Sequence, residues 1–321
     1  MENIYNADDN LETIRVNLKK EQRRLQMRKL LSNHSLVIGA VILLILLAIA
    51  LFAPVITPFD PFEMEVSNRL SPPDHIHLFG TDDFGRDLLT RVVYGARVSI
   101  SVGVAVAVFS SVFGLVIGLY AGYFKGLDHV FMRICDGLIA IPGILLAIAL
   151  MSALGASASN VVIALTIVYT PSIARVVRSS VLSVKEQAYV EAVYVQGAGH
   201  MRILWLNIAP NVLSPLIVQA TFVFASAILS EASLSFLGAG IPAPLASWGN
   251  ILQASKLVIN KAWWMAVFPG GMLILSVLSL NLLGDGLRDF LDPRTKFIKK
   301  KKTAKSKWSG KHGAEASVGD R

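Results

Sequence analysis

The stretch VSISVGVAVAVFSSVFGLVIGLYAGYF, residues 98–124, decides the fold class of this 321-residue chain. It contains no charged side chain, and it exceeds the roughly 20 apolar residues that a helix needs to cross the hydrocarbon core of a membrane. Backbone N–H and C=O groups find no water inside lipid, so a single spanning segment satisfies them internally as a helix. The stretch therefore predicts a transmembrane helix.

Further apolar stretches bring the predicted number of spans to six. They lie at 35–56, 137–174, 212–230 and 262–283, and a soft patch at 155–160 divides 137–174 into two spans. The whole chain is 54% hydrophobic and 16% charged, with a mean hydropathy of +0.57, whereas soluble domains carry about 25% charged residues. The predicted fold class is an all-α polytopic membrane protein with six transmembrane helices.

The distribution of basic residues predicts the orientation of these spans. With six spans and the N-terminus inside, 24 of the 30 Lys and Arg residues fall on the cytoplasmic side and six on the outer side. Cytoplasmic segments of membrane proteins are enriched in Lys and Arg, so both termini are expected in the cytoplasm. The run of lysines at 299–302 is then placed beside anionic lipid, which we favour over nucleic-acid binding as the reason for the net charge of +8.

These patterns divide the chain into four segments. Residues 1–34 form a charged cytoplasmic tail, and 35–97 contain the first span and an extracytoplasmic segment rich in proline. In that segment Asp87 is expected to begin a short helix in the outer membrane interface. Residues 98–287 form the transmembrane core, with a cytoplasmic loop at 183–206, and 288–321 form a basic cytoplasmic tail.

Small residues on one face of the second span predict close helix packing. Gly114, Gly118 and Gly122 are four residues apart, and this spacing lets two helix backbones approach closely in a membrane. Ordinary close packing and a tight seam within a moving bundle are both compatible with this pattern.

The loop at 183–206 interrupts the apolar chain with a helix–turn–helix pattern. Ser183 and Glu186 have the spacing of a capping box, which predicts a helix over 184–196. Gly197 follows where a left-handed residue ends a helix, and a second short helix is expected over 201–206. Pro210 suits the first turn of the fifth span. The loop is therefore expected to be a compact projection, with small side chains on one face that fit a groove in another protein.

This loop resembles the EAA loop of binding-protein-dependent ABC importers. The resemblance rests on Glu191, Ala192 and Gly197, followed by Ile208, Pro210 and Asn211. The chain departs from the family pattern at Val193, where a second alanine is usual, and at Ala209, where a leucine is usual. Neither departure adds a charge or removes the glycine.

Three other blocks narrow the resemblance to the peptide/nickel group of these permeases. They are FGTDDFGRD at 79–87 with YGAR at 94–97, LSFLG at 234–238 with SWG at 247–249, and NLLGDGLRD at 281–289 with LDP at 291–293. Together the matches extend from about residue 30 to residue 294. The resemblance implies the type I ABC importer permease fold in a bacterial cytoplasmic membrane.

The resemblance also implies partners. A second, homologous permease subunit would complete the translocation path, two cytoplasmic ATPase subunits would bind below it, and a solute-binding protein would deliver the solute from outside. The residues implied in contact with the ATPase are Ala188, Glu191, Ala192, Gly197 and Ala198. The sequence contains no phosphate-binding loop of the G-x-x-x-x-G-K-[ST] type. ATP and magnesium are therefore expected on the partner subunits, and no cofactor, metal or catalytic site is expected in this chain.

The residues themselves do not determine which solute is transported. Within the group that the chain resembles, peptide is the preferred solute, and nickel or glutathione is the alternative. The segment containing Asp74, His75 and His77, near Asp82 and Asp83, could hold a transition metal, although two histidines beside a proline pair make a poor preorganised site. A secondary transporter or channel is a more distant alternative.

Acidic residues inside or beside the predicted spans are two further candidates for a function. Glu231 is the only acid within the apolar stretch 212–255, and carboxylates inside membranes often have a function, so it could line the translocation path or fix a neighbouring element. Equally, it could lie in water or in a pair at the outer end of its span. Asp136 and Asp285 could in principle form an intramembrane aspartyl protease, but both lie at span ends.

Overall fold

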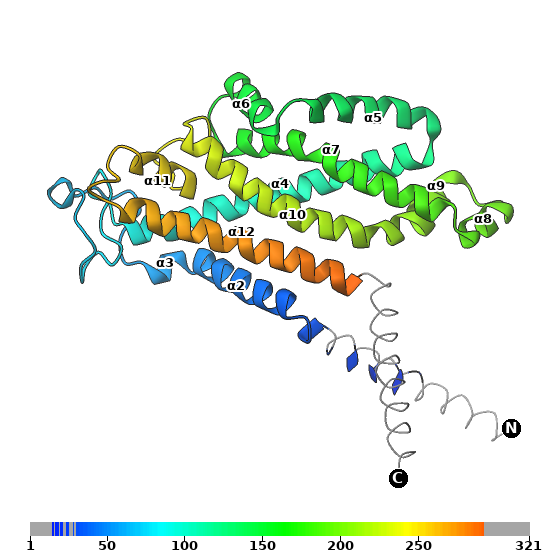
Figure 1. Cartoon of the computed structure of the whole chain (residues 1–321), viewed down its shortest axis with the longest axis horizontal. Coiled ribbons are helices and arrows are strands. Elements are labelled where there is room, and N and C mark those ends of the chain that lie inside the picture. The colour runs from blue at the N-terminus through cyan, green and yellow to red at the C-terminus, as the bar shows by residue number, and fades with distance from the viewer. Residues whose placement is uncertain are drawn as a thin grey trace, which may run out of the picture.

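A computed structural model gives the arrangement of the helices. It describes residues 30–291 and scattered positions between 15 and 28, so most of the predicted N-terminal tail and the basic segment 292–321 lie outside the described residues. Figure 1 shows an elongated bundle in which the long helices run side by side. The principal elements are α2 (His34–Leu51), α3 (Ala53–Ile56), η1 (Val66–Asn68), α4 (Leu88–Tyr123), α5 (Lys125–Ala140), α6 (Gly143–Leu154), α7 (Ala158–Lys185), α8 (Ala188–Val195), α9 (His200–Arg202), η2 (Ile203–Ile208), α10 (Ala209–Phe236), α11 (Trp248–Ser255) and α12 (Trp264–Leu291).

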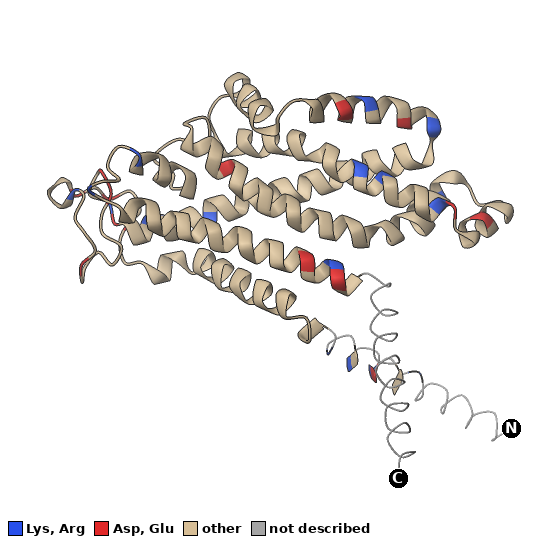
Figure 2. Cartoon of the chain, viewed as in Figure 1, with Lys and Arg blue, Asp and Glu red and all other residues tan. Residues whose placement is uncertain are grey.

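The helical membrane fold predicted from the sequence is confirmed. Among residues 30–291, five helices are long and apolar enough to span a membrane, and the bent pair α5 and α6 supplies a sixth when it is counted as one broken span. Figure 2 shows that most charged residues lie toward the two ends of the bundle and along α5, with few between. One end carries α8 (the α8 end), and the other carries α11 and the loop 57–87 (the α11 end) (Figure 1).

The second span is longer than predicted. The structure contains no separate interfacial helix after Asp87, because α4 runs unbroken from Leu88 to Tyr123. Asp87 does begin the helix: its carboxylate accepts a hydrogen bond from the Thr90 N–H at 2.8 Å and satisfies a free donor of the first turn. The expected interfacial helix and the expected span at 98–124 form one continuous helix, because no residue between 88 and 98 interrupts the backbone hydrogen bonding.

The third span is broken near its middle. Helices α5 and α6 meet at an angle of 94°, and Ile141 between them is extended, with φ −89° and ψ 129°. The residue before a proline is disfavoured in the helical region, because the ring of Pro142 would clash with its backbone. The soft patch predicted at 155–160 does separate two helices, since α6 ends at Leu154 and α7 begins at Ala158.

Helices α4 and α7 make the most extensive helix contact of the described chain, and the three glycines of α4 lie in it. A Cβ atom built on Gly114 would lie 2.6 Å from Cγ2 of Ile173, and one on Gly122 would lie 2.6 Å from Cβ of Val181. On Gly118 it would lie 2.6 Å from the carbonyl oxygen of Ala174. Backbone therefore approaches backbone at a distance that only glycine allows.

Residues 57–87 form an irregular cap at the α11 end. Asp82 organises it: its carboxylate accepts hydrogen bonds from the backbone N–H groups of Phe84 and Arg86 at 2.8 and 3.0 Å, and it pairs with the Arg86 guanidinium at 2.7 Å. Arg91 of α4 lies 3.3 Å from the same carboxylate. The Trp264 indole donates to the Thr81 carbonyl at 3.1 Å, so the loop is fastened to both α4 and α12.

Candidate functional site

The projection at the α8 end differs from its prediction at its start. Ser183 does not cap a helix, because α7 continues through Lys185 and the Ser183 hydroxyl donates to the Ser179 carbonyl within it. The predicted helix over 184–196 is consequently shorter, and α8 begins at Ala188 after Gln187, whose side chain makes no capping bond. The capping-box pattern was wrong here because the apolar face of α7 extends to the buried Val181 and keeps this turn helical.

The end of the projection also differs. The expected short helix over 201–206 is part of one helical run from His200 to Phe236, in which residues 203–208 form a π-helix. Pro210 has no N–H, and its ring would clash with the Leu206 carbonyl in a regular α-helix. The wider π turn just before the proline accommodates it, so the chain does not need to break.

The inner face of α8 is fixed to the bundle. Val190 is buried among the apolar side chains of α7, η2 and α10. The Tyr189 hydroxyl donates to the Asn207 carbonyl at 3.2 Å and accepts a hydrogen bond from the Asn211 amide at 2.9 Å. Motion of α8 would therefore be passed directly to the beginning of α10.

The outer face of α8 is exposed and mostly small. Ala188, Glu191, Ala192 and Val195 follow one another at helical spacing, and all four are exposed, with Val195 79% exposed. Glu191 has no hydrogen bond or ion pair to another described residue, so its carboxylate is free to bind a partner. Ala198 differs from the other predicted contact residues because it packs against the buried cluster, and its N–H donates to the Val193 carbonyl at 3.3 Å.

Gly197 ends α8 in the left-handed conformation that the sequence predicted. Its φ is +83°, and its N–H donates to the Tyr194 carbonyl at 2.9 Å. A Cβ atom at this position would meet no atom within 4 Å. Any internal cost of a side chain here therefore comes from the backbone conformation and not from crowding.

A polar hub links the projection to α4. The Tyr123 hydroxyl and the Nδ1 atom of His200 lie 2.8 Å apart, and the Lys185 ammonium donates to the Tyr123 carbonyl at 2.8 Å. The three residues come from α4, α7 and α9. Sequence reasoning missed this hub, although the signal was a polar residue where α4 and α7 end and where α9 begins.

Glu231 is completely buried near the α11 end. Its side chain is 0% exposed, and it accepts hydrogen bonds from the hydroxyls of Ser99 and Ser235 at 2.8 and 2.9 Å. The Ser99 oxygen also accepts the Trp248 N–H at 3.3 Å. Glu231 thus connects α4 and α10 with the start of α11. The expectation that it lines the translocation path does not fit this burial, and fixing the neighbouring helices does.

We expect Glu231→Ala to destabilise the protein and Glu231→Gln to be tolerated. The alanine leaves a cavity and two buried hydroxyls without their acceptor, at a cost of about 2–5 kcal/mol. Glutamine keeps the shape and can bond both serines. The measurement is the melting temperature of the purified protein in detergent. If the alanine variant had the same melting temperature as the wild type, Glu231 would not hold this region together.

Two ion pairs hold α5 against α7. One of them engages Asp136, which argues against an aspartyl protease formed by Asp136 and Asp285. Asp136 pairs with Arg175 at 2.5 Å, and both oxygens of Asp128 bind the Arg178 guanidinium, one of them at 2.6 Å. Asp285 lies on α12, whose principal neighbours are α2, α10 and α11. Asp136 and Asp285 therefore do not form a catalytic pair in this fold.

The histidine segment has a structural arrangement. The His77 ring is buried, and its Nδ1 atom lies 3.0 Å from Asp87, the residue that caps α4. Among residues 30–291 and the described positions before them, no three His, Cys, Asp or Glu side chains are grouped as metal ligands. Hydrogen bonds from the His77 and Ile76 backbone lower the pKa of Asp74, whereas burial, together with the Asp82 charge, raises the pKa of Asp83.

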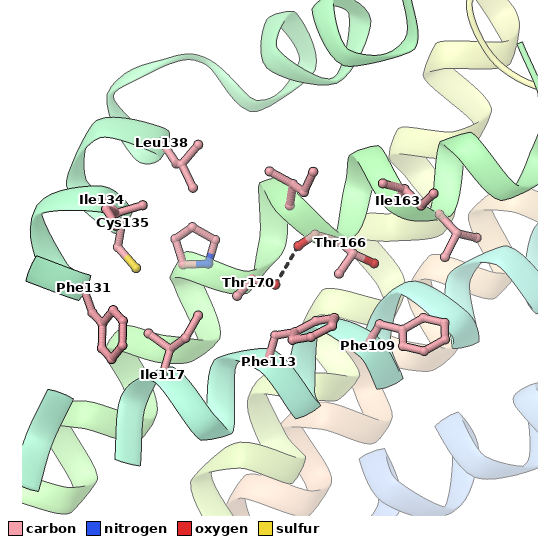
Figure 3. A pocket seen from close by; sticks show the side chains of 13 residues that line it. Phe109, Phe113, Ile117, Phe131, Ile134, Cys135, Leu138, Ile163, Thr166 and Thr170 are labelled. Atoms are coloured by element: carbon pink, nitrogen blue, oxygen red, sulfur yellow. Dashed lines mark hydrogen bonds between the residues drawn. The ribbon is translucent and has the colours of Figure 1, made fainter. Parts of the chain in front are cut away.

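An apolar cavity of about 640 Å³ lies between α4, α5 and α7. Figure 3 shows the aromatic rings of Phe109 and Phe113 on one side and Ile134 and Leu138 on the other. Of its two threonines, Thr170 is satisfied, since its hydroxyl donates to the Thr166 carbonyl of its own helix at 2.7 Å, whereas the buried Thr166 hydroxyl has no hydrogen-bond partner among the described residues. The cavity suits hydrocarbon and does not suit a hydrated solute.

A second cavity, of about 710 Å³, lies among α7, α10 and α12 and contains polar groups. Asn211, Ser214 and Gln219 come from α10, and Arg288 comes from the last turn of α12. We call this the polar groove. Sequence reasoning missed it, although the polar residues at 211, 214 and 219 interrupt an otherwise apolar span.

Comparison with known proteins gives consistent matches over most of the chain. Residues 114–297 match the family model of the binding-protein-dependent transport system inner membrane component, and residues 22–73 match the N-terminal transmembrane domain of oligopeptide transport permease C. A putative peptide transport system permease protein of Brucella abortus is 50% identical over 272 residues, which are 85% of this chain and 92% of that protein.

Two dipeptide transport system permease proteins, both named DppC, are also similar. The protein from Alkalihalophilus pseudofirmus is 45% identical over 270 residues, covering 84% of this chain and 89% of that protein. The protein from Escherichia coli K12 is 46% identical over 271 residues, covering 82% of this chain and 90% of that protein.

Proposed function

The chain belongs to the binding-protein-dependent transport system inner membrane components, and from this membership we propose that it is one permease subunit of an ATP-driven peptide importer. The relatives named above are peptide or dipeptide permeases, which supports a peptide solute over nickel or glutathione. A second permease subunit would complete the path, and a solute-binding protein would supply the peptide.

The observation that carries this proposal is the exposed face of α8. A short helix projects from the end of the bundle, its outer residues are small, and one free carboxylate lies among them. Its inner residues are bonded to α10 through Tyr189 and Asn211. This is a surface on which an ATPase subunit would bind, with a rigid connection from that surface into a spanning helix. ATP and magnesium would be bound by the ATPase subunits.

The experiment is copurification followed by uptake. The chain is expressed with its neighbouring permease, ATPase and binding-protein subunits, and the purified complex is reconstituted in vesicles. We expect ATPase subunits to remain bound and a labelled dipeptide to accumulate only with ATP and the binding protein. Accumulation of nickel or glutathione instead would identify the alternative solutes, and uptake by this chain alone would contradict the importer.

The α8 end is proposed to face the cytoplasm, and cysteine labelling tests this. Val195 is 79% exposed at that end, and Leu257, next to α11, is 96% exposed at the other. Each cysteine is introduced into a variant in which Cys135 is replaced. In sealed right-side-out cells, a membrane-impermeant maleimide should label Leu257→Cys and not Val195→Cys. Labelling at Val195→Cys alone would reverse the topology and remove the ATPase contact with it.

A further inference from the structure

The polar groove among α7, α10 and α12 contains polar groups that have no partner among the described residues. The Gln219 amide, the Ser214 hydroxyl and the Arg288 guanidinium all line it, and none of these side chains makes a hydrogen bond or ion pair with another described residue. Gln219 lies close to the middle of the 37-residue helix His200–Phe236. A polar side chain at such a depth is costly in hydrocarbon, so the groove is expected to contain water or a polar ligand.

The backbone of α10 adds another free group to the groove. Pro215 lies inside this helix, and because proline has no N–H, the Asn211 carbonyl lacks the donor four residues later in the chain. Both residues line the groove. The groove therefore offers a carbonyl acceptor, a hydroxyl, an amide that both donates and accepts, and one cation.

We propose that the polar groove is a low-affinity binding site for a peptide, with Arg288 binding its terminal carboxylate and Gln219 bonding its backbone. This inference rests on the proposed peptide importer and extends it by placing a solute site on this subunit. Guanidinium groups bind carboxylates through two parallel hydrogen bonds. Among the described residues that line the groove, Arg288 is the only ionisable one, so an anionic group is favoured there.

The dimensions agree with a short peptide. Gln219 lies eight positions after Asn211, which corresponds to a rise of about 12 Å along the helix. An extended peptide spans at most about 3.5 Å per residue, so this length accommodates about three or four residues. A volume of about 710 Å³ lies within the usual range of ligand pockets, about 300–1,000 Å³.

The chemistry of the groove disfavours two other occupants. Residues 292–321 follow α12 directly, but they are rich in Lys and Arg, and the Arg288 cation would repel them. A lipid chain would leave Gln219 and the Asn211 carbonyl without hydrogen bonds, and the apolar cavity between α4, α5 and α7 suits such a chain better. A peptide supplies donors, acceptors and a carboxylate together.

The test measures peptide binding to the complete importer in nanodiscs without the binding protein. The probes are alanyl-alanine and its C-terminal amide, and saturation-transfer NMR gives their affinities. We expect the wild type to bind the free acid at least about tenfold more tightly than the amide, since a charged hydrogen bond is lost with the carboxylate. Arg288→Ala should weaken binding of the acid about tenfold and leave the amide unchanged, whereas Gln219→Leu should weaken both.

Matched variants decide the interpretation. Arg133→Ala removes an exposed arginine outside the groove and should bind both probes as the wild type does, and Arg288→Lys should recover part of the loss. Equal affinities in all variants would overturn the proposal, as would no saturable binding to the wild type. An arginine effect that vanishes when anionic lipid is replaced by zwitterionic lipid would also overturn it, in favour of a lipid site. Uptake of dipeptide by the complex with its binding protein, without such direct binding, would reject this groove and leave the importer intact.

Discussion

Replacement of Gly197 by aspartate is expected to abolish transport while the permease still inserts into the membrane. Gly197 has φ +83°, and a side chain in this conformation costs on the order of 1 kcal/mol in backbone strain. A Cβ atom at this position would meet nothing within the subunit, so most of the expected damage arises at the ATPase surface. There the aspartate would introduce bulk and a second negative charge close to Glu191.

Gly199→Asp is the matched control for this change. Gly199 is also exposed with open space around it, but its φ is −67° and it caps α9. Aspartate is a favourable residue at such a cap, so this variant should keep most of its transport. The contrast separates the left-handed backbone and the α8 surface from a general effect of negative charge in the loop.

Glu191→Ala should impair coupling less severely than Gly197→Asp. The carboxylate is placed to bind a cation or donor of the ATPase, and loss of a charged hydrogen bond costs roughly 1.5–3 kcal/mol. Each 1.4 kcal/mol corresponds to a factor of ten, so binding-protein-stimulated ATP hydrolysis should fall about tenfold or more. Glu186→Ala, which removes an exposed carboxylate before α8, should have little effect.

The measurements are ATP hydrolysis and peptide uptake by the reconstituted complex, together with retention of the ATPase subunits on purification. Normal stimulation and normal uptake in both Gly197→Asp and Glu191→Ala would show that α8 is not the coupling element. Loss of uptake with an equal loss of membrane insertion would indicate misfolding of the variant instead of impaired coupling.

Gly118→Leu is expected to prevent assembly of the bundle. The first added atom would already lie 2.6 Å from the Ala174 carbonyl oxygen and 2.6 Å from Cβ of Val177. The first atom belongs to the α7 backbone and the second is the first side-chain atom of Val177, so no rotation of a flexible side chain relieves the overlap. Overpacking of a well-filled core usually costs about 1–3 kcal/mol, and here two backbones must separate along the most extensive helix contact of the described residues.

Gly270→Leu provides the matched control in another spanning helix. A Cβ atom on Gly270 of α12 would meet nothing within 4 Å, so the same change there should leave expression, complex assembly and uptake close to the wild type. Size-exclusion chromatography of the detergent-extracted complex measures assembly. A monodisperse, active complex with Gly118→Leu would show that α4 and α7 can separate without loss of function.

The sequence alone determined the class of the fold, because the forces that set it act locally. Uncharged stretches of sufficient length must be helical in lipid, and this holds for 98–124 whatever surrounds them. Gly197 was predicted at a helix end, and it has the left-handed conformation that such an end requires. The spacing of Gly114, Gly118 and Gly122 also indicated a close approach, although not which helix approaches.

The helix boundaries depended on whether local capping signals or tertiary packing was stronger, which the sequence did not show. Ser183 does not begin a new helix, because the buried face of α7 keeps that turn helical. Pro210 does not interrupt the helical run, because a π-helix precedes it. Each outcome is set by packing energy from distant residues, which outweighs the few tenths to about 2 kcal/mol of a local cap.

Only the tertiary structure decided the roles of the buried polar groups. Glu231 is an isolated acid in the sequence, and its partner Ser99 lies 132 residues away along the chain. Ser99 in turn accepts a hydrogen bond from the backbone N–H of Trp248, 149 residues further along the chain. In the same way, Gln219 and Arg288 lie on different spans and share a groove only because α10 packs beside α12. Local patterns fix which segments are helical because each backbone must satisfy its own hydrogen bonds, whereas the surroundings of a side chain depend on which helices meet.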